Sequence, residues 1–289
     1  MKKCFAIHPL FAAQIEVLLV TCLKSWRSYP AIGRISMRAR TAYRFDVWMG
    51  ATLPFLRVLL AFLLWRILFT SRSEIAGFTL EGMTAYYILT AFLSRLDQSG
   101  GLVWEYADDI REGRFAKYLT KPLNPFGHFL ATSAARSLYV GGVALASVFL
   151  LALLFGNRRL FTSSWQNALM AGIIALLGLS FLACLNWLTA ILAWKFKDIT
   201  GFHLIKGNLV EFLAGTLFPL SLLPEPFVGV LKWLPFYHLH YLPASLFLGR
   251  RQDEALSSLL ILLGWTLGIL VVGEISWRRL RRHDEGVGA

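Results

Sequence analysis

Long apolar runs alternate with short polar segments along most of the chain. The hydrocarbon core of a bilayer is about 30 Å thick, so a helix that crosses it needs about 20 mainly apolar residues. The second and fifth of the predicted spans contain the most polar residues, which are Arg95 and Asp97 in one and His203, Lys206, Asn208 and Glu211 in the other. We expect an all-α membrane protein with six transmembrane helices, near residues 47–70, 79–98, 127–155, 167–194, 200–223 and 255–277.

The composition supports this fold class. Hydrophobic residues make up 56% of the chain and charged residues 16%, whereas soluble domains average about 45–50% and about 25%. The 289 residues suffice for six spans with short loops, but not for an additional nucleotide-hydrolysing domain. The sequence also contains no G-x-x-x-x-G-K-[ST] phosphate loop. We therefore expect neither enzymatic activity nor a bound cofactor on this chain.

The formal charge of +12 arises from basic residues that lie beside apolar runs rather than on one face. This placement is typical of topology signals and argues against a nucleic-acid partner. Because cytoplasmic loops carry an excess of Lys and Arg, both termini are predicted to be cytoplasmic. The cytoplasmic set is Lys24, Arg27, Arg34, Arg38, Arg40, Arg44, Arg111, Arg114, Lys117, Lys121, Lys195, Lys197, Arg278, Arg279, Arg281 and Arg282, against Arg72, Arg158, Arg159, Lys232, Arg250 and Arg251 outside.

Residues 1–36 are predicted to be an amino-terminal extension and residues 37–289 to form the six-helix domain. Residues 5–23 follow two lysines and could be a signal peptide or a further span, but four polar or proline residues interrupt the run and no A-x-A-like cleavage site follows it. Met37 would itself be a reasonable start. The basic stretch from Arg34 to Asp46 is predicted to be an interfacial helix on the inner leaflet, and the alternative is a solvated linker.

The long loop at residues 99–126 contains two predicted short helices, Trp104–Glu112 and Arg114–Lys121, which are broken at Gly113. Pro122 and Pro125 are expected to stop helix formation before the third span. Aromatic residues and charges alternate here, which is typical of a docking surface for a cytoplasmic partner and equally of an amphipathic surface helix that touches only lipid headgroups. We expect these side chains to project toward the cytoplasm, with Asp108, Asp109, Glu112, Arg111 and Arg114 setting the choice of partner and Phe115, Tyr118 and Leu119 on one face.

Residues 218–249 are too apolar for an aqueous loop and too rich in proline for a single span. Irregular backbone at membrane depth requires protein or water to satisfy its polar groups, so a re-entrant hairpin before the last helix is predicted. The alternative is an amphipathic loop at the outer leaflet. The prolines that carry this prediction are Pro219, Pro224, Pro226 and Pro235, with Pro243 further on.

Charged residues within the spans are costly in a membrane and are usually paired. Arg57 and Glu211 both lie near mid-depth by the ~1.5 Å rise per residue of a helix, so they could form a pair. Arg136 and Glu274 lie toward the inner ends of the third and sixth spans. We interpret these charges as structural, with substrate contact or proton coupling as the alternative.

Two other groups of residues could bind a metal. The carboxylates at Asp97, Glu105, Asp108, Asp109 and Glu112 could hold magnesium in a membrane-embedded lipid-modifying transferase, but arginines interleave with them. His238 and His240 form an H-x-H pair without further ligands nearby, and Cys4, Cys22 and Cys184 show no metal-site spacing. We expect no metal on this chain.

The segment IREGRFAKYLTKPLNPFGHFL resembles the I-R-x-G-R … L-x-x-P-L-N-P signature of permease subunits in one branch of type 2 ABC exporters. The matching residues are Ile110, Arg111, Gly113, Arg114, Phe115, Leu119, Pro122, Leu123, Asn124 and Pro125. The resemblance covers about residues 37–280 and includes the AYRFDVW segment (Ala42–Trp48), the order of the six spans and the proline-rich stretch before the last span.

This resemblance implies a permease of the bacterial inner membrane that dimerises with itself or with a related permease. It implies that two separate ATPase subunits bind ATP and Mg and dock on the loop at residues 99–126. It also implies that the proline-rich element closes the exit of the translocation path and that the direction is export. A lipid-modifying transferase and an interaction scaffold without transport remain the alternatives from other classes.

Overall fold

The structure of the protein is a computed structural model that describes residues 28–42, 44–119, 124–156, 163–196 and 198–284. The named elements within these ranges are all helical, and an isolated bridge joins Ile75 to Phe78. The larger helices are α2 (Tyr29–Ala42), α3 (Arg44–Leu68), α4 (Leu80–Leu96), α5 (Ser99–Arg111), α7 (Pro125–Leu154), α8 (Trp165–Ile191), α9 (Thr200–Leu213) and α12 (Ala255–Asp284). The short elements are α6 (Ala116–Leu119), η2 (Leu192–Trp194), η3 (Leu220–Leu222), α10 (Glu225–Leu231), η4 (Pro235–His238), α11 (Tyr241–Phe247) and η5 (Gln252–Glu254).

Within the described residues, three helical segments are long and apolar enough to cross a membrane, namely Pro125–Leu154, Trp165–Trp194 and Gln252–Leu280. Only 22–39% of their most apolar windows is buried inside the molecule, so large apolar surfaces face outward. α4 has 17 residues and α9 has 14. At 1.5 Å per residue they are about 26 and 21 Å long, shorter than a hydrocarbon core of about 30 Å.

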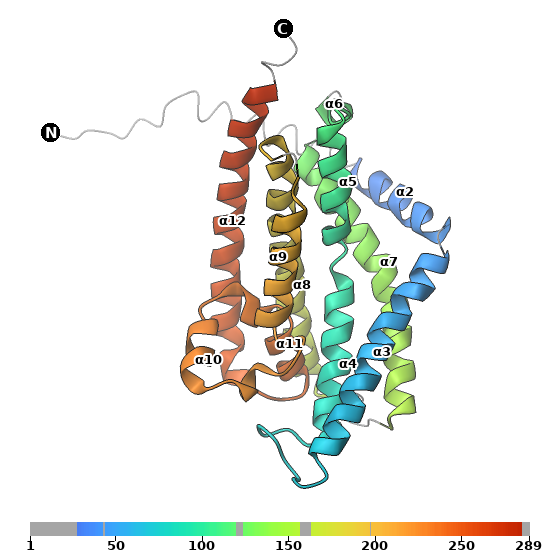
Figure 1. The fold of residues 1–289 in the computed structure, drawn as a ribbon, viewed down its shortest axis with the longest axis vertical. Coiled ribbons are helices and arrows are strands. Elements are labelled where there is room, and N and C mark those ends of the chain that lie inside the picture. The colour runs from blue at the N-terminus through green and yellow to red at the C-terminus, as the bar shows by residue number, and fades with distance from the viewer. Residues whose placement is uncertain (1–27, 43, 120–123, 157–162, 197, 285–289) are drawn as a thin grey trace, which may run out of the picture.

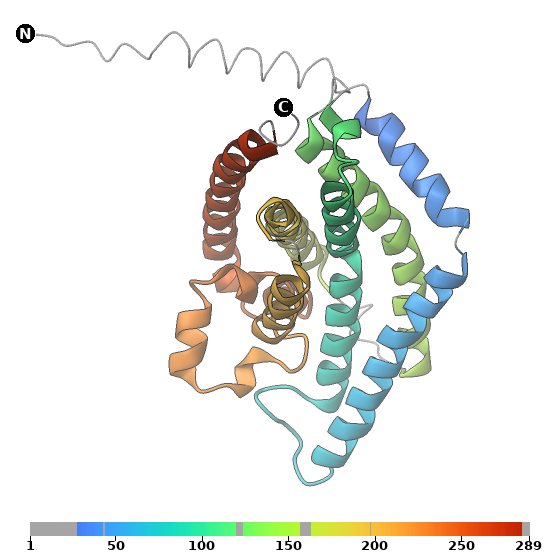
Figure 2. The ribbon, with the colours of Figure 1, turned by 45° about the horizontal axis from the view of Figure 1, so that its top comes forward.

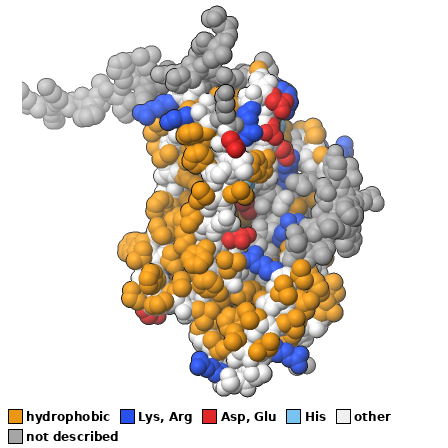
Figure 3. All heavy atoms as spheres, viewed as in Figure 1, with side chains coloured by type: hydrophobic (Ala, Val, Ile, Leu, Met, Phe, Trp, Pro, Cys, Tyr) orange, Lys and Arg blue, Asp and Glu red, His pale blue; other side chains and the backbone are white. Residues whose placement is uncertain are grey.

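The arrangement of the helices separates two ends of the molecule (Figure 1). α5 and α6 lie at one end, together with the carboxyl-terminal end of α12, and α10 and α11 lie toward the other end. Figure 2 shows α8 and α9, in yellow and gold, between α12 in red and α4–α5 in green. Hydrophobic side chains cover much of the described surface that Figure 3 shows, and charged side chains lie at its upper and lower ends and in a patch between them. This distribution fits a helical protein that is embedded in a bilayer.

The buried side chains form two clusters. The first surrounds Tyr86 of α4 and Tyr241 of α11, and the second surrounds Tyr106 of α5 and Trp187 of α8. Burial of each large apolar side chain contributes about 1.5–3 kcal/mol. The second cluster therefore fixes α5 firmly against α8 at the end of the molecule that also carries α6.

The predicted fifth span at residues 200–223 is wrong in its length, because α9 ends at Leu213. Gly215 has a φ of +73°, a left-handed conformation that favours glycine. The Tyr86 hydroxyl donates a hydrogen bond to the Gly215 carbonyl at 2.5 Å, and the Tyr87 hydroxyl donates to the Leu217 carbonyl at 2.8 Å. Two tyrosines of α4 thus bind the backbone that follows α9, and the chain leaves the helical path.

Pro125 begins α7 instead of ending a preceding helix, which corrects the role expected for it. The Asn124 side chain accepts a hydrogen bond from the Phe126 N–H at 2.9 Å, and Pro125 occupies the first turn, where its missing N–H costs nothing. The cap therefore starts the helix at this residue. Pro122 and Leu123, which the same signature includes, lie outside the described residues.

The predicted interfacial helix corresponds in part to α2, which begins before Arg34 and crosses the predicted boundary between residues 36 and 37. A Cβ atom added at Gly33 would lie 3.5 Å from the Ala135 Cβ of α7. α2 therefore packs against the protein along one side. Most of the predicted extension, residues 1–27, lies outside the described residues.

Candidate functional site

The loop at residues 99–126 folds into two short helices, α5 and α6, as the sequence predicted. The break falls at Gly113, whose φ is +70°. A Cβ atom at this position would meet nothing within 4 Å, so the backbone conformation, and not crowding, requires glycine. α5 begins earlier than predicted, at Ser99. We refer to Ser99–Leu119 as the α5–α6 unit.

Phe115 is buried, which corrects the prediction that its side chain projects toward the cytoplasm. Its side chain is only 2% exposed. The centroid of its ring lies 4.7 Å from that of Trp194 and 5.8 Å from that of Trp277. These two tryptophans come from η2 and α12, so Phe115 anchors the α5–α6 unit to the other helices of its own chain. The local sequence pattern could not reveal partners that lie about 80 and 160 residues away.

Tyr106 and Tyr118 extend this aromatic cluster. Their rings stack with centroids 4.9 Å apart. The Tyr106 hydroxyl and His128 Nδ1 of α7 form a hydrogen bond at 2.7 Å. Burial raises the pKa of the Tyr106 hydroxyl well above its usual range, so this group stays protonated at neutral pH. The cluster thereby connects α5 and α6 with α7, α8 and α12.

Asp109 forms the polar centre of the α5–α6 unit. Its carboxylate accepts a hydrogen bond from the Tyr118 hydroxyl at 2.9 Å, pairs with Lys117 Nζ at 2.6 Å and lies 3.2 Å from Arg114 Nε. Burial raises the pKa of Asp109, but the hydrogen bonds from Lys117, Tyr118 and Arg114 outweigh it and lower the pKa below its ordinary value. Asp109 was predicted to set the choice of partner, and the structure uses it instead to join α5 to α6.

The outer surface of the α5–α6 unit carries charges of both signs. Asp108 and Arg111 form an ion pair at 3.4 Å, and Arg114 also pairs with Glu112. The side chains of Asp108, Glu112 and Arg114 are all half exposed. Pairs this exposed contribute little to stability, typically about 0–1 kcal/mol, so they are free to form new pairs with a partner at small cost. We call Asp108, Arg111, Glu112 and Arg114 the charged rim.

The acidic residues that suggested a magnesium site do not form one cluster, because two of them pair with different basic residues. Glu105 faces Arg136, whereas Asp109 faces Lys117. Within the described ranges, no group of three or more His, Cys, Asp or Glu side chains is arranged to hold a metal ion. The two histidines of the H-x-H pair are buried, and His238 Nε2 lies 2.9 Å from the Lys232 carbonyl.

Arg136 and Glu274 have other partners than predicted. Arg136 forms a bidentate pair with Glu105 at 2.6 and 2.8 Å, and Glu274 pairs with Arg278 of its own helix at 2.6 Å. Arg57 and Glu211 do not pair, because α3 packs on α4 and α7 whereas α9 packs beside η4. The tertiary fold decides which faces of two helices meet, and the depth of a residue along its span does not reveal this.

A buried polar network that the sequence did not predict joins the α4–α5 corner to α8 and α9. Asn186 of α8 donates hydrogen bonds to Ser99 Oγ at 2.7 Å and to Asp97 Oδ2 at 3.3 Å. Lys206 of α9 donates to Asn186 Oδ1. The network therefore connects the first residue of α5 to α9 through Asn186 of α8. The polarity of the second and fifth predicted spans, at Asp97 and Lys206, was the signal of it in the sequence.

The proline-rich stretch forms the short helices at the opposite end (Figure 1). Pro224 and Pro226 bracket the start of α10, Pro219 precedes η3, and Pro235 begins η4. The prediction that prolines divide this stretch is confirmed for these four, whereas Pro243 lies inside α11.

Glu254 links the proline-rich stretch to the start of α12. It accepts a hydrogen bond from the Tyr237 hydroxyl at 2.8 Å and pairs with Lys232 at 2.9 Å and Arg251 at 2.7 Å. Arg250 donates to the Gly77 carbonyl at 2.7 Å, and its guanidinium lies 3.8 Å from the centre of the Phe78 ring. The loop between α3 and α4 is thus fastened to the same end of the molecule.

The fold and the site define a helical membrane protein that carries, at one end, an exposed charged surface on a unit held to the other helices by buried aromatic side chains. A family model described as an ABC-2 family transporter protein matches residues 55–284. Because the match covers most of the chain, the chain belongs to the ABC-2 transporter family. It is a multi-pass membrane protein of the ABC-transporter permease type. No curated protein matches the chain.

Proposed function

We propose that the chain is the permease subunit of an exporter in the bacterial inner membrane, driven by a separate ATPase subunit that binds ATP and Mg. In this proposal the chain crosses the membrane six times, places both termini in the cytoplasm and works as a dimer. The family supports an ABC-transporter permease. The basic residues beside the spans support the orientation.

The α5–α6 unit is the observation that carries the proposal. Its charged rim is exposed, while Phe115 and Tyr106 are buried among residues of α8, η2 and α12. A partner that binds the rim therefore pushes on a unit whose base is packed into the helices. Because packed aromatic side chains deform little, a displacement at the rim moves α8 and α12 as well.

The polar network provides a second connection, from α5 to α9. Ser99 and Lys206 both bind Asn186, so movement of α5 changes the contacts that hold α9 in place. Trp104 of α5 also packs against His203 of α9, with ring centroids 4.9 Å apart. We infer that rearrangement of α9 is the step by which ATPase closure opens the translocation path.

The exposed face of α9 supports the dimer. Glu211 is exposed on this helix beside the apolar residues Leu209 and Phe212. A carboxylate that faces lipid near mid-depth is costly. A second copy of the chain, or a water-filled path between two copies, would remove this cost. The short helices α10 and α11 would then close the outer end of the path.

Co-purification with the ATPase subunit tests the proposal. We expect the double variant Arg111→Glu and Arg114→Glu to lose the ATPase, because two exposed cations of the rim become anions. Arg72→Glu is the matched control, since Arg72 is exposed in the loop between α3 and α4. The proposal fails if the double variant keeps a full complement of ATPase and wild-type transport while Arg72→Glu behaves in the same way.

A further inference from the structure

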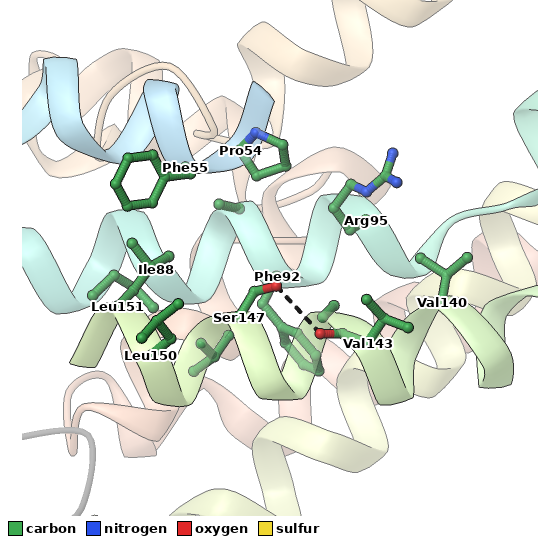
Figure 4. Close-up of a pocket in the computed structure, with 13 residues that line it drawn as sticks. Pro54, Phe55, Ile88, Phe92, Arg95, Val140, Val143, Ser147, Leu150 and Leu151 are labelled. Carbon is green, nitrogen blue, oxygen red and sulfur yellow. Dashed lines mark hydrogen bonds between the residues drawn. The ribbon is translucent and has the colours of Figure 1, made fainter. Parts of the chain in front are cut away.

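An apolar cavity of about 240 Å³ lies between α3, α4 and α7. Figure 4 shows Pro54 and Phe55 of α3 and Phe92 of α4 around it, with Arg95 at the end of α4. Of the described residues that line the cavity, Arg95 is the charged one. The others that the argument uses are Ala91 of α4 and Val140, Ala144, Ser147 and Leu151 of α7.

The amino-acid sequence explains why the cavity exists. Pro54 lies inside α3, where it removes one backbone hydrogen bond and bends a helix. Ala91 and Ala144 contribute only methyl groups to the opposite walls. The Ser147 hydroxyl donates to the Val143 carbonyl of its own helix at 3.2 Å, the dashed line in Figure 4. The walls therefore offer few partners to water, and apolar cavities of this kind bind apolar groups.

The length of the cavity matches one leaflet of a bilayer. Its lining on α7 runs from Val140 to Leu151, about 17 Å at 1.5 Å per residue. One leaflet contributes about 15 Å of hydrocarbon, half of a core about 30 Å thick. An acyl chain that enters at the Arg95 end and lies along α7 would fill the cavity, with its methyl end past the midplane of the bilayer.

The Arg95 side chain would reach a lipid phosphate if Leu80 lies at the opposite boundary of the hydrocarbon core. Arg95 is 15 residues from Leu80 at the opposite end of α4, or about 23 Å along the helix, which leaves roughly 7 Å to the boundary of a core about 30 Å thick. A long arginine side chain can extend over such a distance to the interface. The guanidinium has five donors and binds phosphate in a bidentate manner, even when one donor already has a protein partner.

We propose that this cavity binds one acyl chain of an anionic phospholipid from the inner leaflet, with the Arg95 guanidinium on its phosphate. Charge complementarity supports this ligand, because α2, which carries Arg34 and Arg38, leads into α3 beside the cavity. The lipid is a resident ligand that sets the angle between α3 and α4, and α4 leads directly into α5. The site rests on the proposed orientation, which puts Arg95 toward the inner leaflet, and it is independent of the proposed coupling to an ATPase.

Native mass spectrometry of the full-length chain, released from nanodiscs that contain phosphatidylglycerol and phosphatidylethanolamine, tests the site. We expect the wild type to retain phosphatidylglycerol preferentially. Arg95→Gln should weaken this retention by about tenfold, the effect of losing one charge-assisted contact. Ala144→Phe should abolish retention of both lipids, because the ring fills the cavity. The matched controls are Arg66→Gln, an exposed arginine at the far end of α3, and Leu145→Phe, an exposed neighbour on α7.

Several outcomes would overturn the proposal. One is equal retention of phosphatidylglycerol by Arg95→Gln and Arg66→Gln. Another is unchanged retention in Ala144→Phe, and a third is efficient disulfide formation between two copies of Phe55→Cys, which would show that a second chain covers the cavity. If Arg95→Gln fails to fold, the wild-type preference for phosphatidylglycerol over phosphatidylethanolamine and the Ala144→Phe result decide the question.

Discussion

Replacing Phe115 with alanine should detach α6 from the helices beneath it. The ring is 2% exposed and has the rings of Tyr106, Tyr118, Trp194 and Trp277 within 6.3 Å. Truncation of a buried phenylalanine costs about 3–5 kcal/mol. Domains have a free energy of unfolding of about 5–15 kcal/mol, so most of the protein should stay folded while the α5–α6 unit opens locally.

Hydrogen exchange of the backbone amides of α6 measures this opening. Each 1.4 kcal/mol changes an equilibrium constant tenfold, so we expect protection to fall by a hundredfold or more, even without the ATPase subunit. Phe115→Leu should retain most of the protection. Phe227→Ala is the matched control, because Phe227 is 66% exposed on α10. If Phe115→Ala loses the ATPase while its exchange stays at the wild-type rate, Phe115 contacts the partner directly and the packing described above is wrong.

Three further results are expected. Arg136→Ala should lower the free energy of unfolding by only about 1 kcal/mol in a thermal unfolding assay, because its partner Glu105 is half exposed and can be solvated. A loss above about 3 kcal/mol would contradict this. Folding lowers the pKa of Asp109, so its contribution to stability is complete above the ordinary carboxylate pKa and is lost as the pH falls toward its pKa in the folded protein. Asp109→Asn should therefore reduce the loss of stability at acidic pH. A cysteine in place of Glu112 should resist membrane-impermeant thiol reagents in intact cells, whereas one in place of Arg72 should react, and the reverse pattern would invert the orientation.

The sequence predicted the elements that depend on local rules. Apolar runs of about 20 residues indicated the long helices, because a segment in lipid must satisfy its backbone N–H and C=O groups with hydrogen bonds of its own. Gly113 indicated the break between α5 and α6, and the structure places a positive φ at that residue. The prolines between residues 218 and 249 likewise indicated short helical pieces, since each proline removes a donor.

The sequence failed where distant residues decide the local structure. α9 stops at Leu213 because Tyr86 and Tyr87 of α4 bind the backbone beyond it. Phe115 is buried because Trp194 and Trp277 come from helices far away in the sequence. Residue spacing within a single segment gives no information about either contact.

The charged residues within the spans show the same limitation. Depth along a span can be estimated from residue number, but the rotation of a helix about its own axis cannot. Arg136 was assigned to the wrong environment, because its side chain turns toward Glu105 of α5. Candidate ion pairs in membrane proteins therefore need helix orientation as well as depth.

The aromatic cluster at the base of the α5–α6 unit gives the protein a built-in optical reporter. Of its 10 tryptophans, four lie in or against this cluster, namely Trp104, Trp187, Trp194 and Trp277, and the rings of Trp194 and Trp277 are 5.2 Å apart. Indole emission shifts to longer wavelength when the ring gains contact with water. Lifting of α6 would admit water to these rings, so unlabelled protein should signal the motion through its intrinsic fluorescence. The tryptophans that hold the α5–α6 unit in place would then also report its release in real time.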